Sequence, residues 1–139
     1  MDILNSEFLL FLSCAKKCRL NYLLIGGYAV NYYGYTRNTK DLDVWIEPTN
    51  ENRQRFIDTL ICMNYTEQET SPLLDEYLTQ PFTATIGAWP SAMDFLTFIH
   101  RDIDFSTAFK SREIFITENG IEVFFIPYEF LKESKLRRA

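Results

Sequence analysis

Apolar residues along the chain follow two repeats, one typical of helices and one typical of strands. The helical repeat predicts helices over residues 6–18, 28–33, 50–63, 105–111 and 127–138. Short apolar or alternating runs predict strands over residues 22–26, 42–47, 82–88, 92–99, 113–117 and 121–126. The polar stretch 66–81 carries two prolines and is interpreted as a loop. This order predicts an α+β domain, with a mixed β-sheet and helices packed mainly on one face.

The length, charge and ends of the chain narrow the class of protein. Its 139 residues fit a single domain, 1–139, and its 47% hydrophobic content can form one core. A net charge of −5 argues against non-specific binding of nucleic acid, which needs an excess of Lys and Arg. The first residues lack the basic start of a signal peptide, and no apolar run approaches a membrane span. We therefore expect a cytoplasmic protein with no membrane partner.

Three cysteines occur, at positions 14, 18 and 62. The odd number and the lack of a C-x-x-C pair predict neither a disulfide framework nor a structural zinc site. Cys14 and Cys18 lie four residues apart in an expected helix, so we interpret them as small core residues.

Candidate chemistry begins with Gly26-Gly27, between an expected strand and an expected helix. Glycine lets the backbone approach a phosphate closely, and the start of a helix offers free N–H groups. Taken alone, the pair has an equally good steric explanation, because many turns between a strand and a helix use glycine.

Acidic residues provide the second part of the pattern. Asp41 and Asp43 flank Leu42 at the start of a strand, so alternation directs both carboxylates to one face. Two adjacent carboxylates repel each other unless a cation lies between them, and carboxylates with phosphates suit Mg²⁺. Asp94 is the lone acid in an apolar run and completes a three-carboxylate cluster if its strand lies beside 42–47. A solvated strand edge and a solvent-facing Asp94 are the simpler alternatives.

Together these residues resemble the signature of the nucleotidyltransferase superfamily. Ile25-Gly26-Gly27 is followed, after thirteen residues, by Asp41-Leu42-Asp43-Val44. The Tyr-Ala after the glycines and the Arg37-x-Thr39-x-Asp41 approach are similar to the small bacterial branch, which includes minimal nucleotidyltransferases and relatives of abortive-infection and toxin–antitoxin enzymes. The segment 92–97 (AMDFLT) resembles the strand that carries the third acid of the family.

The resemblance implies a metal-dependent transfer of a nucleoside monophosphate from a triphosphate, with ATP as the expected donor, to a hydroxyl of a small molecule, RNA or protein. Asp41, Asp43 and Asp94 would be the catalytic and metal-binding carboxylates for one or two Mg²⁺ ions. Gly26, Gly27, Arg37 and Lys40 would bind the phosphates. For the two cations, ordinary solvated surface is the alternative.

A second function remains open from the sequence. Many members of this branch continue beyond a lysine that corresponds to Lys135, whereas this sequence ends at Ala139. The acceptor-binding part is then expected from a second protomer, in a homodimer, or from a small partner protein, or it is absent. The alternative function is a binding or regulatory module of the same fold that acts with a partner, as in a toxin–antitoxin pair.

Overall fold

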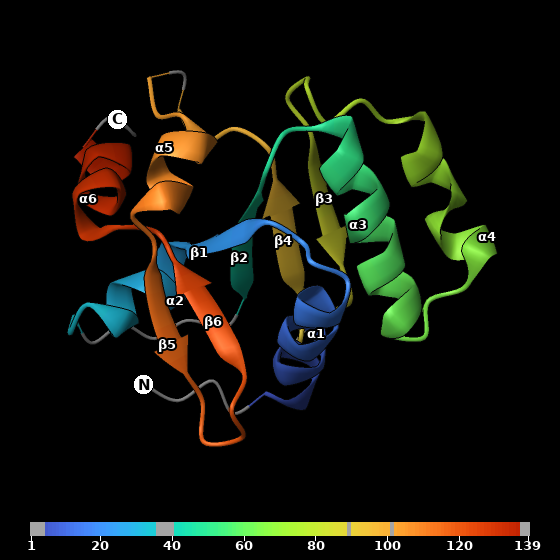
Figure 1. Cartoon of the computed structure of the whole chain (residues 1–139), viewed down its shortest axis with the longest axis horizontal. Helices are drawn as coiled ribbons and strands as arrows, with labels where there is room; N and C mark the ends of the chain where they lie inside the picture. The colour runs from blue at the N-terminus through green and yellow to red at the C-terminus, as the bar shows by residue number, and fades with distance from the viewer. Residues whose placement is uncertain (1–4, 36–40, 89, 101, 137–139) are drawn as a thin grey trace.

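A six-stranded mixed sheet forms the centre of the molecule, in the strand order β3-β4-β2-β1-β6-β5 (Figure 1). The computed structural model describes residues 5–35, 41–88, 90–100 and 102–136. The strands are β1 (Tyr22–Ile25), β2 (Leu42–Ile46), β3 (Thr83–Ile86), β4 (Met93–Leu96), β5 (Glu113–Ile116) and β6 (Glu122–Phe125). The helices are α1 (Ser6–Lys17), α2 (Gly26–Tyr32), α3 (Asn50–Cys62), α4 (Glu67–Thr70), the 3-10 helix η1 (Ser71–Asp75), α5 (Phe105–Lys110) and α6 (Tyr128–Leu136). The α+β class and the mixed sheet predicted from the sequence are confirmed.

The strand pairings bring together segments that are far apart in the sequence. Strand β1 runs antiparallel to β2 on one side and parallel to β6 on the other. Strand β2 also pairs with β4 in parallel, and the edge strands β3 and β5 pair antiparallel with β4 and β6. The carboxyl-terminal end of β1 thereby lies against the start of β2, and the start of β2 lies against the start of β4.

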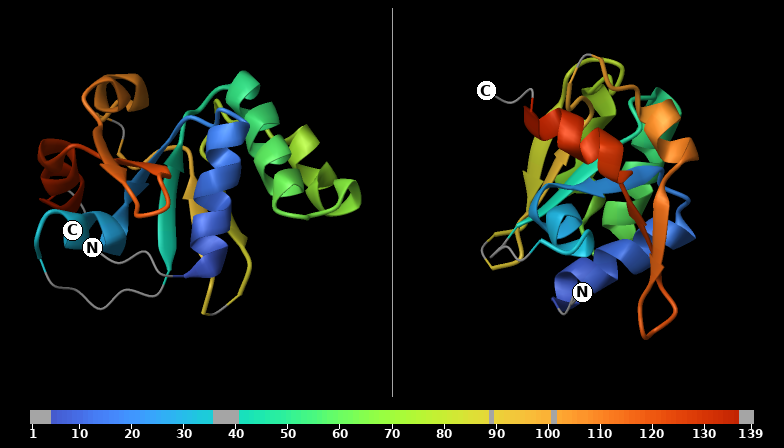
Figure 2. Two further views of the ribbon diagram at one scale, coloured as in Figure 1. Left: turned by 60° about the horizontal axis from the view of Figure 1, so that its bottom comes forward. Right: turned by 90° about the vertical axis from the view of Figure 1, so that its left-hand side faces the viewer.

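Helices α1 and α3 lie side by side over one face of the sheet (Figures 1 and 2). Phe11 of α1 and Phe56 of α3 both pack against Phe95 of β4, with ring centroids 5.3 and 4.7 Å apart. Leu42 and Val44 of β2 are fully buried beneath them. Burial of these large apolar side chains is the main source of stability for this layer.

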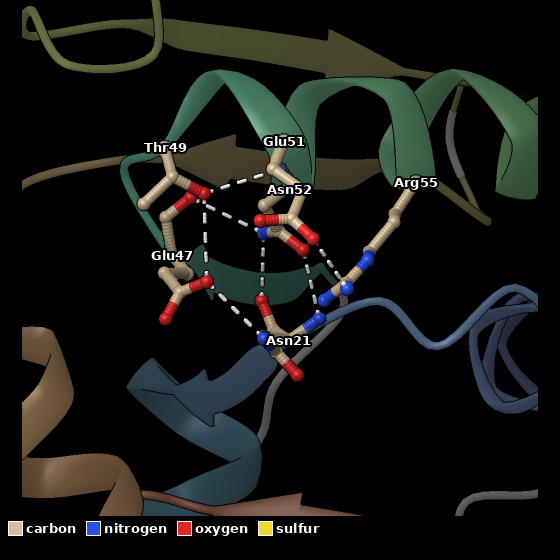
Figure 3. Close-up of polar contacts among 6 residues, drawn as sticks. All are labelled: Asn21, Glu47, Thr49, Glu51, Asn52 and Arg55. Carbon is tan, nitrogen blue, oxygen red and sulfur yellow. Dashed lines mark hydrogen bonds and ion pairs between the residues drawn. The ribbon is translucent and has the colours of Figure 1, made fainter.

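A buried amide fixes how β1 and β2 are joined to α3 (Figure 3). Asn52 of α3 is fully buried, and its Oδ1 accepts from the backbone N–H of Asn21, at 3.0 Å. Its Nδ2 donates to the backbone oxygens of Asn21 and Glu47, at 3.0 and 3.2 Å. Because Asn21 precedes β1 and Glu47 follows β2, this one side chain holds both strands at the end remote from Gly26.

The structure departs from the sequence expectations in one stretch, and side chains cap the starts of α1 and α5. The stretch 66–81 is not simply a loop, because it contains α4 and η1, and Thr66 and Glu69 form a reciprocal capping box at the start of α4. The residue that caps α1 is Asn5, whose Oδ1 accepts from the N–H groups of Glu7 and Phe8. Asp104 caps α5 by accepting from the N–H of Thr107.

The expectation that no disulfide forms is wrong. Cys14 of α1 and Cys62 of α3 are disulfide-bonded, with their Cα atoms 5.7 Å apart, and Cys18 is a free thiol. The pairing follows from the packing of two helices that are 48 residues apart in sequence, which cysteine spacing alone does not reveal.

Within the described ranges, each helix is too short or too polar to cross a membrane.

Candidate functional site

The centre of the site is the junction of β1 and α2, where the chain turns at Gly26. Gly26 has a φ of +66°, a left-handed conformation that favours glycine. A Cβ atom at Gly26 would lie 2.9 Å from Cγ and 3.0 Å from Cβ of Asp43. The Asp43 side chain therefore lies directly against the backbone of Gly26, and any larger residue at position 26 would displace it. Gly27 follows as a buried residue of α2.

Four residues form a row across the neighbouring strands. Ile25 of β1 is opposite Asp43 of β2, Asp43 is opposite Asp94 of β4, and Asp94 is opposite Thr85 of β3. Paired residues in a sheet direct their side chains to the same face, so the two carboxylates are direct neighbours. Both are only half-buried, while Leu42 and Val44 on either side of Asp43 are buried.

A hydroxyl on the edge strand holds Asp94. The Thr85 Oγ1 donates to Oδ1 of Asp94 at 2.6 Å. A charge-assisted hydrogen bond of this length restrains the carboxylate and leaves its other oxygen for a further contact. Thr85 was not recognised from the sequence, because a threonine in an alternating strand carries no chemical signal until its neighbour across the strands is known.

Asp41 lies just outside β2, in a bend, and is exposed. Burial of the Tyr28 hydroxyl raises its pKa above the ordinary value, and the negative charge of Asp41 raises that pKa further. Tyr28 belongs to α2 and packs edge-on against Phe8, with ring centroids 5.7 Å apart. The Asp41 carboxylate is therefore close enough to α2 for its charge to act on a residue that directly follows the glycine pair.

The pair of carboxylates, Asp43 and Asp94, provides too few ligands to hold a metal ion alone. It suits a metal ion that is bound together with a substrate. Among the residues that the structure describes, no three His, Cys, Asp or Glu side chains are grouped as a metal site. Mg²⁺ commonly takes one or two carboxylates and completes its shell with phosphate oxygens and water. The adjacent Asp43 and Asp94 fit that pattern, and the side chain of Asp43 lies against the backbone of Gly26. The catalytic and metal-binding assignment of Asp41, Asp43 and Asp94 stays a prediction.

The tyrosines near the glycine pair divide into structural and accessible ones. Tyr32 stacks on Phe125 with centroids 4.2 Å apart, and Tyr33 donates its hydroxyl proton to the backbone oxygen of Ile126. Tyr35 is 56% exposed and shares a hydrogen bond of 2.9 Å with the hydroxyl of Tyr128. These two rings line a cavity of about 280 Å³ between α2 and α6, together with Val30, Leu131 and Lys132. This cavity is an apolar feature whose tyrosine rings could accept a flat base.

Arg37 and Lys40, the two cations expected to bind phosphate, lie outside the described residues. Their proposed roles therefore stay predictions from the sequence.

Comparison with known proteins bears on the fold. No family model and no curated protein sequence matches the chain. The structure is similar to the crystal structure of "a putative nucleotidyltransferase" from Thermotoga maritima, with a TM-score of 0.64 and 11% sequence identity. The match covers 94% of this chain and 81% of the other. The chain thus has a nucleotidyltransferase-like fold over nearly its whole length, as the sequence pattern predicted.

Proposed function

We propose that this chain is a nucleotidyltransferase, which transfers a nucleoside monophosphate from a nucleoside triphosphate to a hydroxyl group. The observation that carries the proposal is the contact of Asp43 with the backbone of Gly26, directly beside Asp94. A glycine turn next to paired carboxylates provides a place where phosphates approach the backbone and acidic side chains at once. The similar fold of a protein described as a nucleotidyltransferase supports the same reaction class.

In the proposed reaction the acceptor oxygen attacks the α-phosphorus of the triphosphate. A new oxygen–phosphorus bond forms, the bond to the bridging oxygen of the β-phosphate breaks, and pyrophosphate leaves with that electron pair. The proton of the acceptor hydroxyl passes to a carboxylate, for which Asp94 is our candidate because Thr85 already orients it. Mg²⁺, when bound with the triphosphate, would supply the positive charge that offsets the phosphate oxygens and the two aspartates.

The proposed roles of the other residues of the site follow from where each lies in the fold or in the sequence. Asp43 and Asp41 would hold the metal-bound triphosphate from the β2 side, and Gly26 and Gly27 would let its phosphates lie against the backbone. Arg37 and Lys40 would neutralise the triphosphate or the leaving pyrophosphate. ATP is the expected donor, and the acceptor is a small molecule, an RNA or a protein. A second protomer or a small partner would complete the acceptor side.

A turnover assay tests the reaction. The chain is incubated with Mg²⁺ and each of the four triphosphates labelled at the α-phosphate, and released pyrophosphate and labelled acceptor are measured. We expect one triphosphate to be consumed by the wild type and turnover to fall at least about 100-fold in Asp43→Asn and Asp94→Asn. Asp58→Asn, which removes an exposed carboxylate of α3, serves as the matched control and should behave as wild type.

Each outcome of the assay has a separate meaning. Free nucleoside monophosphate without a labelled acceptor would indicate hydrolysis at the same carboxylates instead of transfer. Triphosphate binding without turnover, restored by a partner, would favour the regulatory module of a two-protein system. Equal turnover in wild type and Asp43→Asn would refute the proposed site.

A further inference from the structure

A second cavity lies at the opposite end of β1 from the candidate nucleotide site. It has a volume of about 230 Å³ and lies between the end of α1, the start of β1, the end of α5, and β6. Its lining includes Asn21, which precedes β1, and Tyr22, the first residue of β1, whereas Gly26 follows the last residue of that strand.

The lining of this cavity is cationic although the chain as a whole is acidic. Lys16, Arg19 and Arg112 face one acid, Glu122, which gives a formal charge of +2 in a chain of net charge −5. Lys16 and Glu122 form an ion pair at 2.9 Å, so two guanidinium groups remain without an acidic partner in the lining. Lys16 and Arg19 lie near the end of α1, and Arg112 lies just after α5, so the helix dipoles favour cations at these positions.

The Arg112 side chain is held in a fixed orientation. Its guanidinium carbon lies 4.1 Å from the ring centre of Phe109 and 4.5 Å from that of Phe124. One terminal nitrogen donates to the backbone oxygen of Phe109 at 3.0 Å. Its Nε is buried and has no hydrogen-bond partner among the described residues.

We propose that this cavity binds a small molecule that carries a phosphate or carboxylate group. Arginine presents a planar fork that matches the oxygens of either group, and Arg19 and Arg112 bring two such side chains to the lining. The rings of Tyr22, Phe109 and Phe124 provide an apolar wall for the body of the ligand. The cavity is smaller than typical sites for drug-sized molecules, which limits the ligand to about the size of a phosphorylated ring. The site is independent of the proposed nucleotidyl transfer.

Nuclear magnetic resonance of the full chain tests this site with phenyl phosphate and benzoate as separate probes. We expect at least one probe to bind with a dissociation constant below about 1 mM and to shift the Nε–H signal of Arg112 and the amide signals of Arg19 and Asn21. The probe that binds more tightly identifies which oxyanion the cavity prefers.

Three variants make the test specific. Arg112→Lys keeps the charge but removes the fork, and Arg19→Asn removes a charge at a φ of +58° that asparagine tolerates. Each should weaken binding about ten-fold or more, while the amide spectrum stays that of a folded protein. Lys110→Gln, an exposed cation of α5 outside the cavity, is the control and should bind as wild type. No binding of either probe, equal binding by all variants, or shifts centred on Gly26 and Gly27 would each overturn the proposal.

Discussion

The contact between Gly26 and Asp43 is the detail on which the candidate site depends. It combines a positive φ with a side chain packed against the position of the missing Cβ. The positive φ favours glycine in any turn of this shape. The packing of the Asp43 side chain against Gly26 is a second and separate reason for glycine at this position. The glycine and the aspartate are thus parts of one local structure, although they are seventeen positions apart in the sequence.

Replacement of Gly26 by alanine should therefore do more than strain the backbone. We expect Gly26→Ala to lose roughly 3 kcal/mol of unfolding free energy and all measurable triphosphate binding, because the new methyl group displaces Asp43. Gly120→Ala is the matched control, since Gly120 has a φ of +79° and no atom within 4 Å of the added Cβ. This variant should lose only about 1 kcal/mol of unfolding free energy, because the positive φ is unfavourable for alanine. Equal losses, measured by chemical denaturation, would contradict the proposed contact.

Thr85 should act on the reaction through Asp94. Thr85→Val keeps the shape of the side chain but removes the hydrogen bond to Oδ1 of Asp94. We expect kcat to fall about ten-fold with little change in KM for the triphosphate, because the carboxylate loses its orientation but the phosphate contacts remain. Thr85→Ser should restore kcat. A change confined to thermal stability, with kcat unaffected, would show that Thr85 is only structural.

Tyr22 gives the folded state a dependence on alkaline pH. Burial, the largest cause, raises the pKa of this hydroxyl above its ordinary value of 10.0. The stabilisation from the neutral hydroxyl is complete below pH 10 and decreases as pH rises toward the raised pKa, because the unfolded chain ionises first. The free energy of unfolding should fall by up to about 1.4 kcal/mol per pH unit above pH 10. Denaturation of Tyr22→Phe should show a shallower slope, and the exposed Tyr77→Phe an unchanged one. Parallel slopes in all three proteins would refute this account.

At the scale of elements, Asn52 links a helix to the two strands that carry the site. Asn52→Ala leaves the N–H of Asn21 without its acceptor and removes a donor from two backbone oxygens. We expect a loss of about 2 kcal/mol in urea denaturation. Gln54→Ala removes an exposed amide from the same helix and should change stability by less than about 0.5 kcal/mol. Similar effects of the two substitutions would show that the Asn52 contacts carry no net stability.

Several elements and one half of the site could be predicted from the sequence. The repeats located α1, β1, β2, α3 and the β5–β6 hairpin, because each has a clear helical or alternating pattern. The glycine pair and Asp43 were found because they belong to one short stretch. The adjacency of Asp43 and Asp94 depends on the parallel pairing of β2 with β4, which are about fifty residues apart, and a local pattern cannot establish it. The roles of Thr85 and Asn52 were missed for the same reason.

At the scale of the molecule, the disulfide between Cys14 and Cys62 joins the two helices that cover one face of the sheet. A bond that closes a loop of 48 residues lowers the conformational entropy of the unfolded chain. In the chain-entropy model this stabilises the folded state by about 4 kcal/mol. We expect dithiothreitol to lower the Tm of the wild type to that of Cys62→Ser. The Cys18→Ser variant should respond to the reductant as the wild type does. A Tm that is insensitive to the reductant would show that the bond contributes nothing to stability.

The whole fold directs the glycine turn and two carboxylates to one place, and the central claim is that a triphosphate binds there. A crystal structure with a non-hydrolysable triphosphate and Mn²⁺, which is located by its anomalous signal, tests that claim most directly. We predict the phosphates against the backbone of Gly26 and Gly27, with a cation in contact with Asp43 and Asp94. A triphosphate bound elsewhere, or a cation that touches neither aspartate, would contradict the account.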